Sequence, residues 1–167
     1  MGATIDEIRD QLLALLPRLH RFCVGLTGSV SDGEDLAQDT IERALRNLHS
    51  WEPGTRLDSW MFRIAKNRFI DRHRATKREN LVPMSDEVQD MNCGSVDGAR
   101  IVESRLTLTK VNQALQTLPL EQREAVVLVL IDGMPYREAA DALEIPIGTL
   151  TSRISRARAA LVAAMGG

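Results

Sequence analysis

The chain has 167 residues, a formal net charge of −2 and an apolar content of 44%, which is enough for one folded domain or two small ones. Aromatic residues make up only 4% while Ala and Leu dominate, and this favours helices over sheets. There is no apolar run long enough to span a membrane and no secretory signal pattern. We therefore expect a cytoplasmic protein without membrane insertion.

Residues suited to catalysis or metal binding are scattered. His20, His49 and His73 lie far apart, and Cys23 and Cys93 lack metal-ligand spacing. We predict no enzyme activity, cofactor, metal or small-molecule substrate. Cys23, in an apolar helical context, is predicted to belong to the core. Cys93 lies in a polar segment and is predicted to be an inert exposed thiol, with a redox role as the alternative.

The N-terminal segment predicts a helix that starts at a capping box, Thr4-Ile5-Asp6-Glu7. Pro17 is expected to kink or restart this helix, and Gly28 is expected to end it. The apolar positions that indicate its buried face are Ile8, Leu12, Leu15, Leu16, Leu19, Phe22, Cys23 and Leu26.

A second capping box, Ser31-Asp32-Gly33-Glu34, predicts a helix that runs to about Leu48. The periodicity places one set of residues inward: Leu36, Ala37, Thr40, Ile41, Ala44, Leu45 and Leu48. The outer face is polar, and simple solvation is its default interpretation. It carries Asp35, Gln38, Asp39, Glu42, Arg43 and Arg46.

A loop at Ser50–Leu57, indicated by Pro53-Gly54, precedes a third helix over residues 58–78 with Asp58 or Ser59 as its cap. Residues 63–78 carry a net charge of +6. Basic side chains interleaved with Trp60, Phe62 and Phe69 indicate a nucleic-acid surface, especially for unstacked bases. The polar residues of this surface are Arg63, Lys66, Asn67, Arg68, Arg72, Arg74, Lys77 and Arg78.

Residues 79–100 carry a net charge of −4 and show weak periodicity. A segment of roughly 20 such residues is unusual inside one compact domain, so we predict an acidic, flexible linker between domains 1–78 and 101–167.

In the second domain we expect a helix at Ile101–Thr117, with Val102, Leu106, Leu108, Val111 and Leu115 available for packing. Pro119 begins the next helix, whose apolar run within Glu121–Asp132 is predicted to be buried, and Gly133 caps it.

The segment Pro135–Leu161 predicts a helix-turn-helix. Tyr136, Ala139, Ala140 and Leu143 form one helical face, and Ile145-Pro146 then breaks the pattern. The second helix places Ile147, Leu150, Ile154 and Leu161 inward. Its other face carries Thr149, Ser152, Arg153 and Arg156, side chains able to contact base edges or phosphates. A helical hairpin with a solvated basic face is the alternative interpretation.

Three segments together resemble a known family. DGEDLAQDTIERAL (32–45), WMFRIAKNRFIDRHR (60–74) and LPLEQREAVVLVLIDGMPYREAADALEIPIGTLTSRISRARAAL (118–161) are similar, in order and spacing, to segments of bacterial RNA polymerase sigma factors. The class is the extracytoplasmic-function (ECF, group 4, sigma-70 family) class. The resemblance covers nearly the whole length and implies an all-α protein of two helical domains, sigma regions 2 and 4, joined by a flexible linker.

The resemblance also implies roles for individual residues. Core RNA polymerase would bind Asp35, Gln38, Asp39, Glu42 and Arg43. The −10 element would be recognised and melted by Trp60, Arg63, Asn67, Arg68 and Arg72, with a flipped base received by the loop Pro53, Gly54, Thr55, Arg56 and Leu57. The −35 element would contact Thr149, Thr151, Ser152, Arg153, Ser155 and Arg156. Many relatives carry larger or basic residues in place of Thr151 and Ser155, so the −35 sequence is not predicted.

The implied function is an alternative sigma factor that directs promoter-specific initiation, with core RNA polymerase, promoter DNA and an anti-sigma factor as partners. One alternative is a sigma-like decoy that sequesters an anti-sigma factor. A decoy does not bind DNA, so it does not need the basic residues of segment 63–78, and their presence argues against this alternative. Another alternative is an ordinary transcriptional regulator that uses only residues 118–161, and this leaves the basic third helix without a role.

Overall fold

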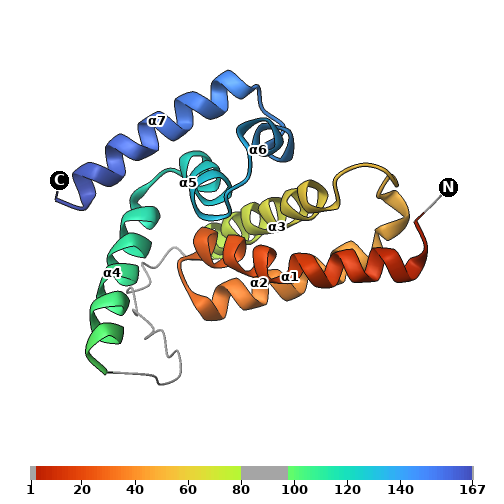
Figure 1. Ribbon diagram of the computed structural model, residues 1–167, viewed down its shortest axis with the longest axis horizontal. Helices are drawn as coiled ribbons and strands as arrows, with labels where there is room; N and C mark the ends of the chain where they lie inside the picture. Colours follow the sequence, from red (N-terminus) through yellow and green to blue (C-terminus); the bar gives the residue numbers. More distant parts are fainter. Residues whose placement is uncertain (1–2, 80–97, 167) are drawn as a thin grey trace.

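The computed structural model describes residues 3–79 and 98–166, with side chains placed from residue 107 in the second range. Its regular elements within these ranges are all helical, which confirms the all-α class. Helices α1–α3 form one group and α4–α7 a second group packed beside it (Figure 1). No helix among the described residues is both long and apolar enough to cross a membrane.

Helix α1 spans Ile5–Thr27 and begins with the predicted capping box. Thr4 Oγ1 accepts from the Glu7 amide, and the Thr4 amide donates to the Glu7 carboxylate. Gly28 ends the helix in the left-handed conformation (φ 78°), as expected. The expectation that Pro17 restarts the helix is wrong. Proline removes the hydrogen bond to the Leu13 carbonyl, but Leu13 is 56% exposed, so water can bind there.

Helix α2 spans Val30–Arg46, and its cap is Ser29 rather than the predicted Ser31. Ser29 Oγ accepts from the Asp32 amide at 3.3 Å. Packing against α1 explains the earlier start. A Cβ on Gly33 would lie 2.6 Å from a methyl group of Val24 and 2.8 Å from its backbone, so glycine permits the contact. Leu45, predicted to face inward, is 55% exposed, because α1 and α3 cover only one side of α2.

Helix α3 spans Leu57–Glu79, after a 3₁₀ turn at Leu48–Ser50. It starts earlier than predicted, so Asp58 and Ser59 lie in its first turn and do not cap it. Phe62 is 1% exposed, and its ring centroid lies 4.9 Å from that of Phe22. Its assignment to the nucleic-acid surface is therefore wrong: Phe62 belongs to the core.

The second group starts with α4, Gly98–Thr117, and α5, Leu120–Val126, which continues into a π-helical turn at Val127–Ile131. The Asp132 amide donates to the Val127 carbonyl, five residues earlier. Residues 125–129 of the apolar run are buried as predicted, but the last two, Leu130 and Ile131, are exposed. The run covers more of the helix circumference than neighbouring elements can bury. Of the residues predicted to pack from α4, Leu115 is buried, whereas Leu108 is exposed.

The helix-turn-helix consists of α6, Tyr136–Leu143, and α7, Ile147–Ala164. Glu144 ends α6 in the left-handed conformation (φ 57°) before Pro146 starts α7. The predicted inner faces are confirmed by the burial of Ala139, Ala140, Leu143, Leu150 and Ile154. Ile147 is the exception: it is 49% exposed because it opens the helix at the turn.

Cys23 is fully buried, as predicted, and burial raises the pKa of its thiol to about 12. Cys93, and the linker interpretation of the segment that contains it, lie outside the described residues. The same holds for the side chains of Val102 and Leu106.

The two groups are joined where α1 ends. Side chains of the second group donate to three carbonyls there: Asn112 to Gly28, Gln116 to Gly25 and Arg123 to Leu26. Arg18 of α1 also binds the carboxylate of Asp132, which is 3% exposed at the side chain, at 2.8 Å. The termini of helices leave unpaired carbonyls, so the second group completes the C-terminal end of α1.

Candidate nucleic-acid interface

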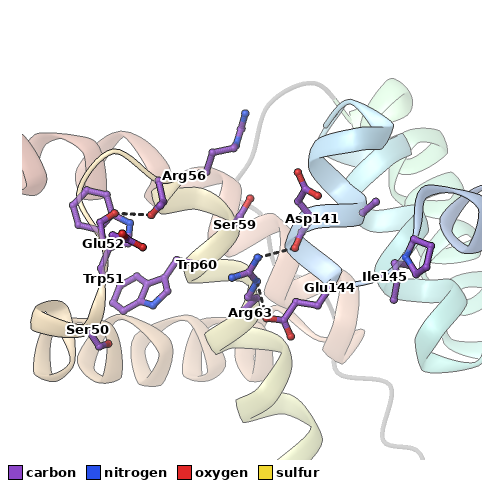
Figure 2. A pocket seen from close by; sticks show the side chains of 13 residues that line it. Ser50, Trp51, Glu52, Arg56, Ser59, Trp60, Arg63, Asp141, Glu144 and Ile145 are labelled. Carbon is purple, nitrogen blue, oxygen red and sulfur yellow. Dashed lines mark hydrogen bonds and ion pairs between the residues drawn. The ribbon is translucent and has the colours of Figure 1, made fainter.

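A pocket of about 700 Å³ lies between the start of α3 and α6 (Figure 2). One wall comes from the segment before α3 and its first two turns. The opposite wall comes from α6 and the turn after it. Its lining includes Trp51, Thr55, Arg56, Trp60 and Arg63 on one side and Asp141 and Glu144 on the other.

Three residues that line this pocket have a buried polar atom with no hydrogen-bond partner among the described residues: Trp51 Nε1, Ser59 Oγ and Arg63 Nε. A buried polar group without a partner is costly, so these atoms favour a polar occupant. The sequence interpretation assigned Arg63 to a site but missed Trp51 and Ser59. Only their positions in the sequence could have indicated them, because Trp51 lies just before Pro53-Gly54 and Ser59 lies one residue before Trp60.

Of the predicted loop residues, Thr55 and Arg56 line this pocket. Pro53, Gly54, Thr55 and Arg56 are exposed, whereas Leu57 is the first residue of α3 and is buried in the core. Gly54 has a φ of 93°, which other residues seldom adopt. The loop surface is thus made by the four residues before Leu57.

A second cleft, of about 470 Å³, lies further along α3. It brings Asn67 and Arg68 of α3 together with Arg43 of α2, residues assigned to two different predicted sites. Asn67 is exposed there, so its amide is accessible to a ligand.

Arg68 and Arg72 bind Asp39 of α2. Their terminal nitrogens lie 2.7 Å and 3.1 Å from Asp39 Oδ2. Burial alone would raise the pKa of Asp39, but hydrogen bonds and charge from the two arginines outweigh it, and the pKa lies below its usual value. Asp39 therefore holds α2 against α3, whereas Asp35, Gln38, Glu42 and Arg43 are exposed on the outer face of α2.

The outer face of α7 carries the residues predicted for the −35 element. Thr151, Ser152, Ser155 and Arg156 are exposed, while Thr149 and Arg153 are half-buried. Thr151 Oγ1 donates to the Ile147 carbonyl at 2.9 Å. Arg153 lies 3.8 Å from carboxylate oxygens of both Glu121 and Glu124. Arg153 is thus tied to α5, and the exposed side chains form a continuous polar surface.

Comparison with protein families gives two matches that follow the two groups of helices. Residues 12–79 match Sigma-70 region 2, and residues 108–161 match Sigma-70 region 4. The chain is also 37% identical, over 95% of its length and 84% of the relative, to the ECF RNA polymerase sigma factor EcfG of Rhodopseudomonas palustris. The chain belongs to the ECF sigma factors.

Other ECF sigma factors agree with this assignment. SigW of Bacillus subtilis is 32% identical over 93% of this chain and 87% of its own. Among solved structures, the sigma factor RpoE in complex with the anti-sigma factor NepR from Bartonella quintana matches with a TM-score of 0.78. It is 32% identical, and the match covers 96% of this chain and 98% of RpoE. The match thus extends over both sigma regions, and region 2 ends where α3 ends.

Proposed function

We propose that this ECF sigma factor binds core RNA polymerase and directs promoter-specific initiation through both promoter elements. The observation that carries the proposal is the pairing of sigma regions 2 and 4 in one chain, each with an exposed polar face. A regulator that used only the helix-turn-helix would leave the α3 surface without a role. The proposed division is residues 1–78 for region 2, 79–100 for the linker and 101–167 for region 4.

The −10 element is proposed to bind along α3 and the loop before it. Its separated strand would pass Trp60, Arg63, Asn67, Arg68 and Arg72, with one flipped base in the pocket beside Thr55 and Arg56. The pocket supports this role because it offers Trp51 Nε1 and Ser59 Oγ as unpaired polar atoms and Trp60 as an aromatic surface. Such contacts offset the few kcal/mol that unstacking a base costs.

The −35 element is proposed to bind the outer face of α7, with its major groove against Thr149, Thr151, Ser152, Ser155 and Arg156. A helix that presents hydroxyls and a guanidinium suits base edges and phosphates. Arg153, tied to Glu121 and Glu124, is proposed to act at the edge of this surface.

The outer face of α2 is proposed to bind core polymerase. Asp35, Gln38, Glu42 and Arg43 are exposed there, and Asp39 fixes the face relative to α3. An anti-sigma factor is proposed as a further partner, because the solved relative RpoE is in complex with one.

In vitro transcription tests this function. Purified core polymerase would be incubated with the sigma factor and a pool of genomic promoter fragments, and start sites would be mapped with and without it. We expect specific starts only in its presence, and their alignment would give both promoter elements. Binding to core without any initiation would favour the decoy alternative, and binding to neither core nor promoter would reject the proposal.

Replacing Asn67 by alanine is expected to impair open-complex formation more than closed-complex binding, because its amide would contact an unstacked base. Loss of one such contact corresponds to about 1–3 kcal/mol, or roughly five- to 150-fold. Permanganate reactivity of unpaired thymines would report melting, and gel mobility at low temperature would report closed complexes. Arg74→Ala, in the same cleft, is the control, expected to change salt dependence more than melting. An unchanged melting signal for Asn67→Ala would reject the role.

Replacing Asp35 and Gln38 together by alanine is expected to weaken binding to core polymerase about tenfold or more, as truncation of central interface residues does. Both side chains are exposed on α2, so the fold should be unaffected. The dissociation constant would be measured from the fluorescence anisotropy of the labelled sigma factor during titration with core polymerase. Asp10→Ala is the control: it removes an exposed carboxylate from a different helix, α1. Equal losses for both variants would place the contact elsewhere.

A further inference from the structure

Asp39, on α2, binds two arginines of α3 that are proposed to contact −10 DNA. Arg68 Nε and Arg68 Nη2 lie 2.8 Å and 2.7 Å from Asp39 Oδ2, and Arg72 Nη2 lies 3.1 Å from the same oxygen. Arg72 Nη2 also lies 3.5 Å from the Asp35 carbonyl oxygen. The Asp39 carboxylate is ionised at neutral pH, because its pKa lies below its usual value. One carboxylate oxygen thus anchors two cations of the DNA surface.

We propose that Asp39 is a positioning residue for −10 recognition: it fixes the guanidinium groups of Arg68 and Arg72 in the directions in which they contact the DNA strand. Asp39 itself touches no DNA and acts through the two arginines. This role rests on the proposed function and deepens it, because it gives Asp39 a part in DNA binding in place of a direct contact with core polymerase.

The environment of Asp39 differs from that of the other α2 residues assigned to core polymerase. Asp39 is half-buried, with 24% of its side chain exposed, and its Oδ2 atom is surrounded by nitrogens of Arg68 and Arg72. A polymerase group that took this carboxylate would have to break both ion pairs, and charges left without partners are costly when partly buried. The other members of the set are exposed: Asp35, Gln38, Glu42 and Arg43.

Anchoring leaves part of each arginine available to DNA. A guanidinium has five N–H donors in a rigid plane, and the contacts with α2 use one edge of Arg68 and one terminal nitrogen of Arg72. Their side chains are still 26% and 42% exposed. A long side chain that is already ordered loses less conformational entropy on binding. Arg68 also lines the cleft that contains Asn67, so its direction shapes the wall beside that amide.

Two other arginines at the same cleft lack such an anchor. Arg43 and Arg74 line it and are exposed, and neither forms an ion pair within the part of the chain that the structure describes. Such side chains contribute to phosphate binding through their charge, and this contribution depends strongly on salt. The anchored pair adds a fixed geometry, which sets the register of the strand on the protein.

Removal of the Asp39 charge has two effects of opposite sign. Replacing the carboxylate by an amide raises the net charge by one, so electrostatics alone predicts tighter binding to DNA. Loss of positioning predicts weaker binding, because both arginines must then be ordered when DNA arrives. We expect positioning to dominate, since salt screens charges at a solvent-facing surface. Asp39→Asn should therefore bind the −10 strand about tenfold more weakly.

The test uses holoenzyme assembled from core polymerase and full-length sigma factor variants. Fluorescence anisotropy would follow its binding to a fluorescein-labelled single strand that carries the mapped −10 sequence. Asp71→Asn is the matched control for Asp39→Asn. Asp71 lies on α3 at the same cleft, is exposed and has no ion pair with any described residue, so its replacement shows the effect of charge alone. We expect Asp71→Asn to bind equally or more tightly than the unaltered chain.

A double-mutant cycle separates positioning from a general loss of stability. In a chain that carries Arg68→Ala and Arg72→Ala, Asp39→Asn should cause no further loss of DNA affinity, because the groups through which Asp39 acts are gone. Asp39→Glu, which keeps a carboxylate, should retain more affinity than Asp39→Asn. The same loss with and without the two arginines would overturn positioning, as would unchanged or tighter binding by Asp39→Asn.

Affinity for core polymerase is a separate readout. Its dissociation constant should be the same for Asp39→Asn and the unaltered chain, and a tenfold increase would show that Asp39 contacts the polymerase directly. That result would overturn the positioning role and leave the proposed function intact. If holoenzyme with the unaltered chain does not bind the −10 strand, the proposed function itself fails. If it binds and Asp39→Asn binds equally well, only the positioning role fails.

Discussion

Replacing Phe62 by alanine should lower the free energy of unfolding by about 3–5 kcal/mol, the usual cost of removing a buried aromatic ring. Phe62 is 1% exposed, contacts the Phe22 ring and has the Arg18 guanidinium 5.5 Å from its ring centroid. Removing the ring would leave a cavity between α1 and α3. It would also remove support for Arg18, which binds the carboxylates of Asp58 and Asp132. Urea unfolding followed by far-UV circular dichroism would measure the change.

Trp60→Ala is the control for Phe62→Ala. Trp60 is half-buried and lines the pocket, so its removal should cost less stability and mainly weaken binding of single-stranded −10 DNA. The two variants would then identify Phe62 as a core residue and Trp60 as a DNA-binding residue. Equal stability of Phe62→Ala and the unaltered chain would contradict the packing of α3 on α1.

Local sequence signals predicted most of the helices. Capping at Thr4, the stop at Gly28 and the break at Pro146 act within a few residues, so the sequence alone reveals them. Two errors arose where tertiary packing decides. Ser29 and Ser31 are both suitable caps, and the close approach of Gly33 to Val24 selects Ser29. Trp60 and Phe62 are both aromatic neighbours of basic residues, and only the position of α1 distinguishes their environments.

The ion pairs that connect distant helices could not be predicted from the sequence. The sequence shows the basic charge of the α3 stripe, but the partners of Arg63 and Lys66 lie on α6 and α5, far along the chain. Asp39 was assigned to polymerase binding by resemblance, whereas its carboxylate binds Arg68 and Arg72 in this structure. Ion pairs between distant segments depend on how the helices pack, which periodicity does not specify.

The second large effect is expected at the −35 surface, where Arg156→Ala should weaken binding to promoter duplex. Arg156 is exposed on α7, and the opposite side of that helix is anchored by Leu150, Ile154 and Ala157, all buried. A guanidinium that binds a guanine through two hydrogen bonds contributes about 1–3 kcal/mol of discrimination, or roughly five- to 150-fold. The loss of affinity should be specific for duplexes that carry the cognate −35 sequence, and binding to core polymerase should be unchanged.

Arg158→Ala is the matched control for Arg156→Ala, because two helical positions lie about 200° apart around the axis. Both side chains are exposed and both variants remove one positive charge. If α7 enters the major groove on its Ser152 and Arg156 side, Arg158 would at most contact phosphate, and its loss would lower affinity equally for cognate and mutated −35 sequences. Electrophoretic mobility shifts with the two duplexes would separate these results. Equal, sequence-independent losses for both variants would mean that α7 binds only the DNA backbone, and a joint loss of core binding would indicate misfolding.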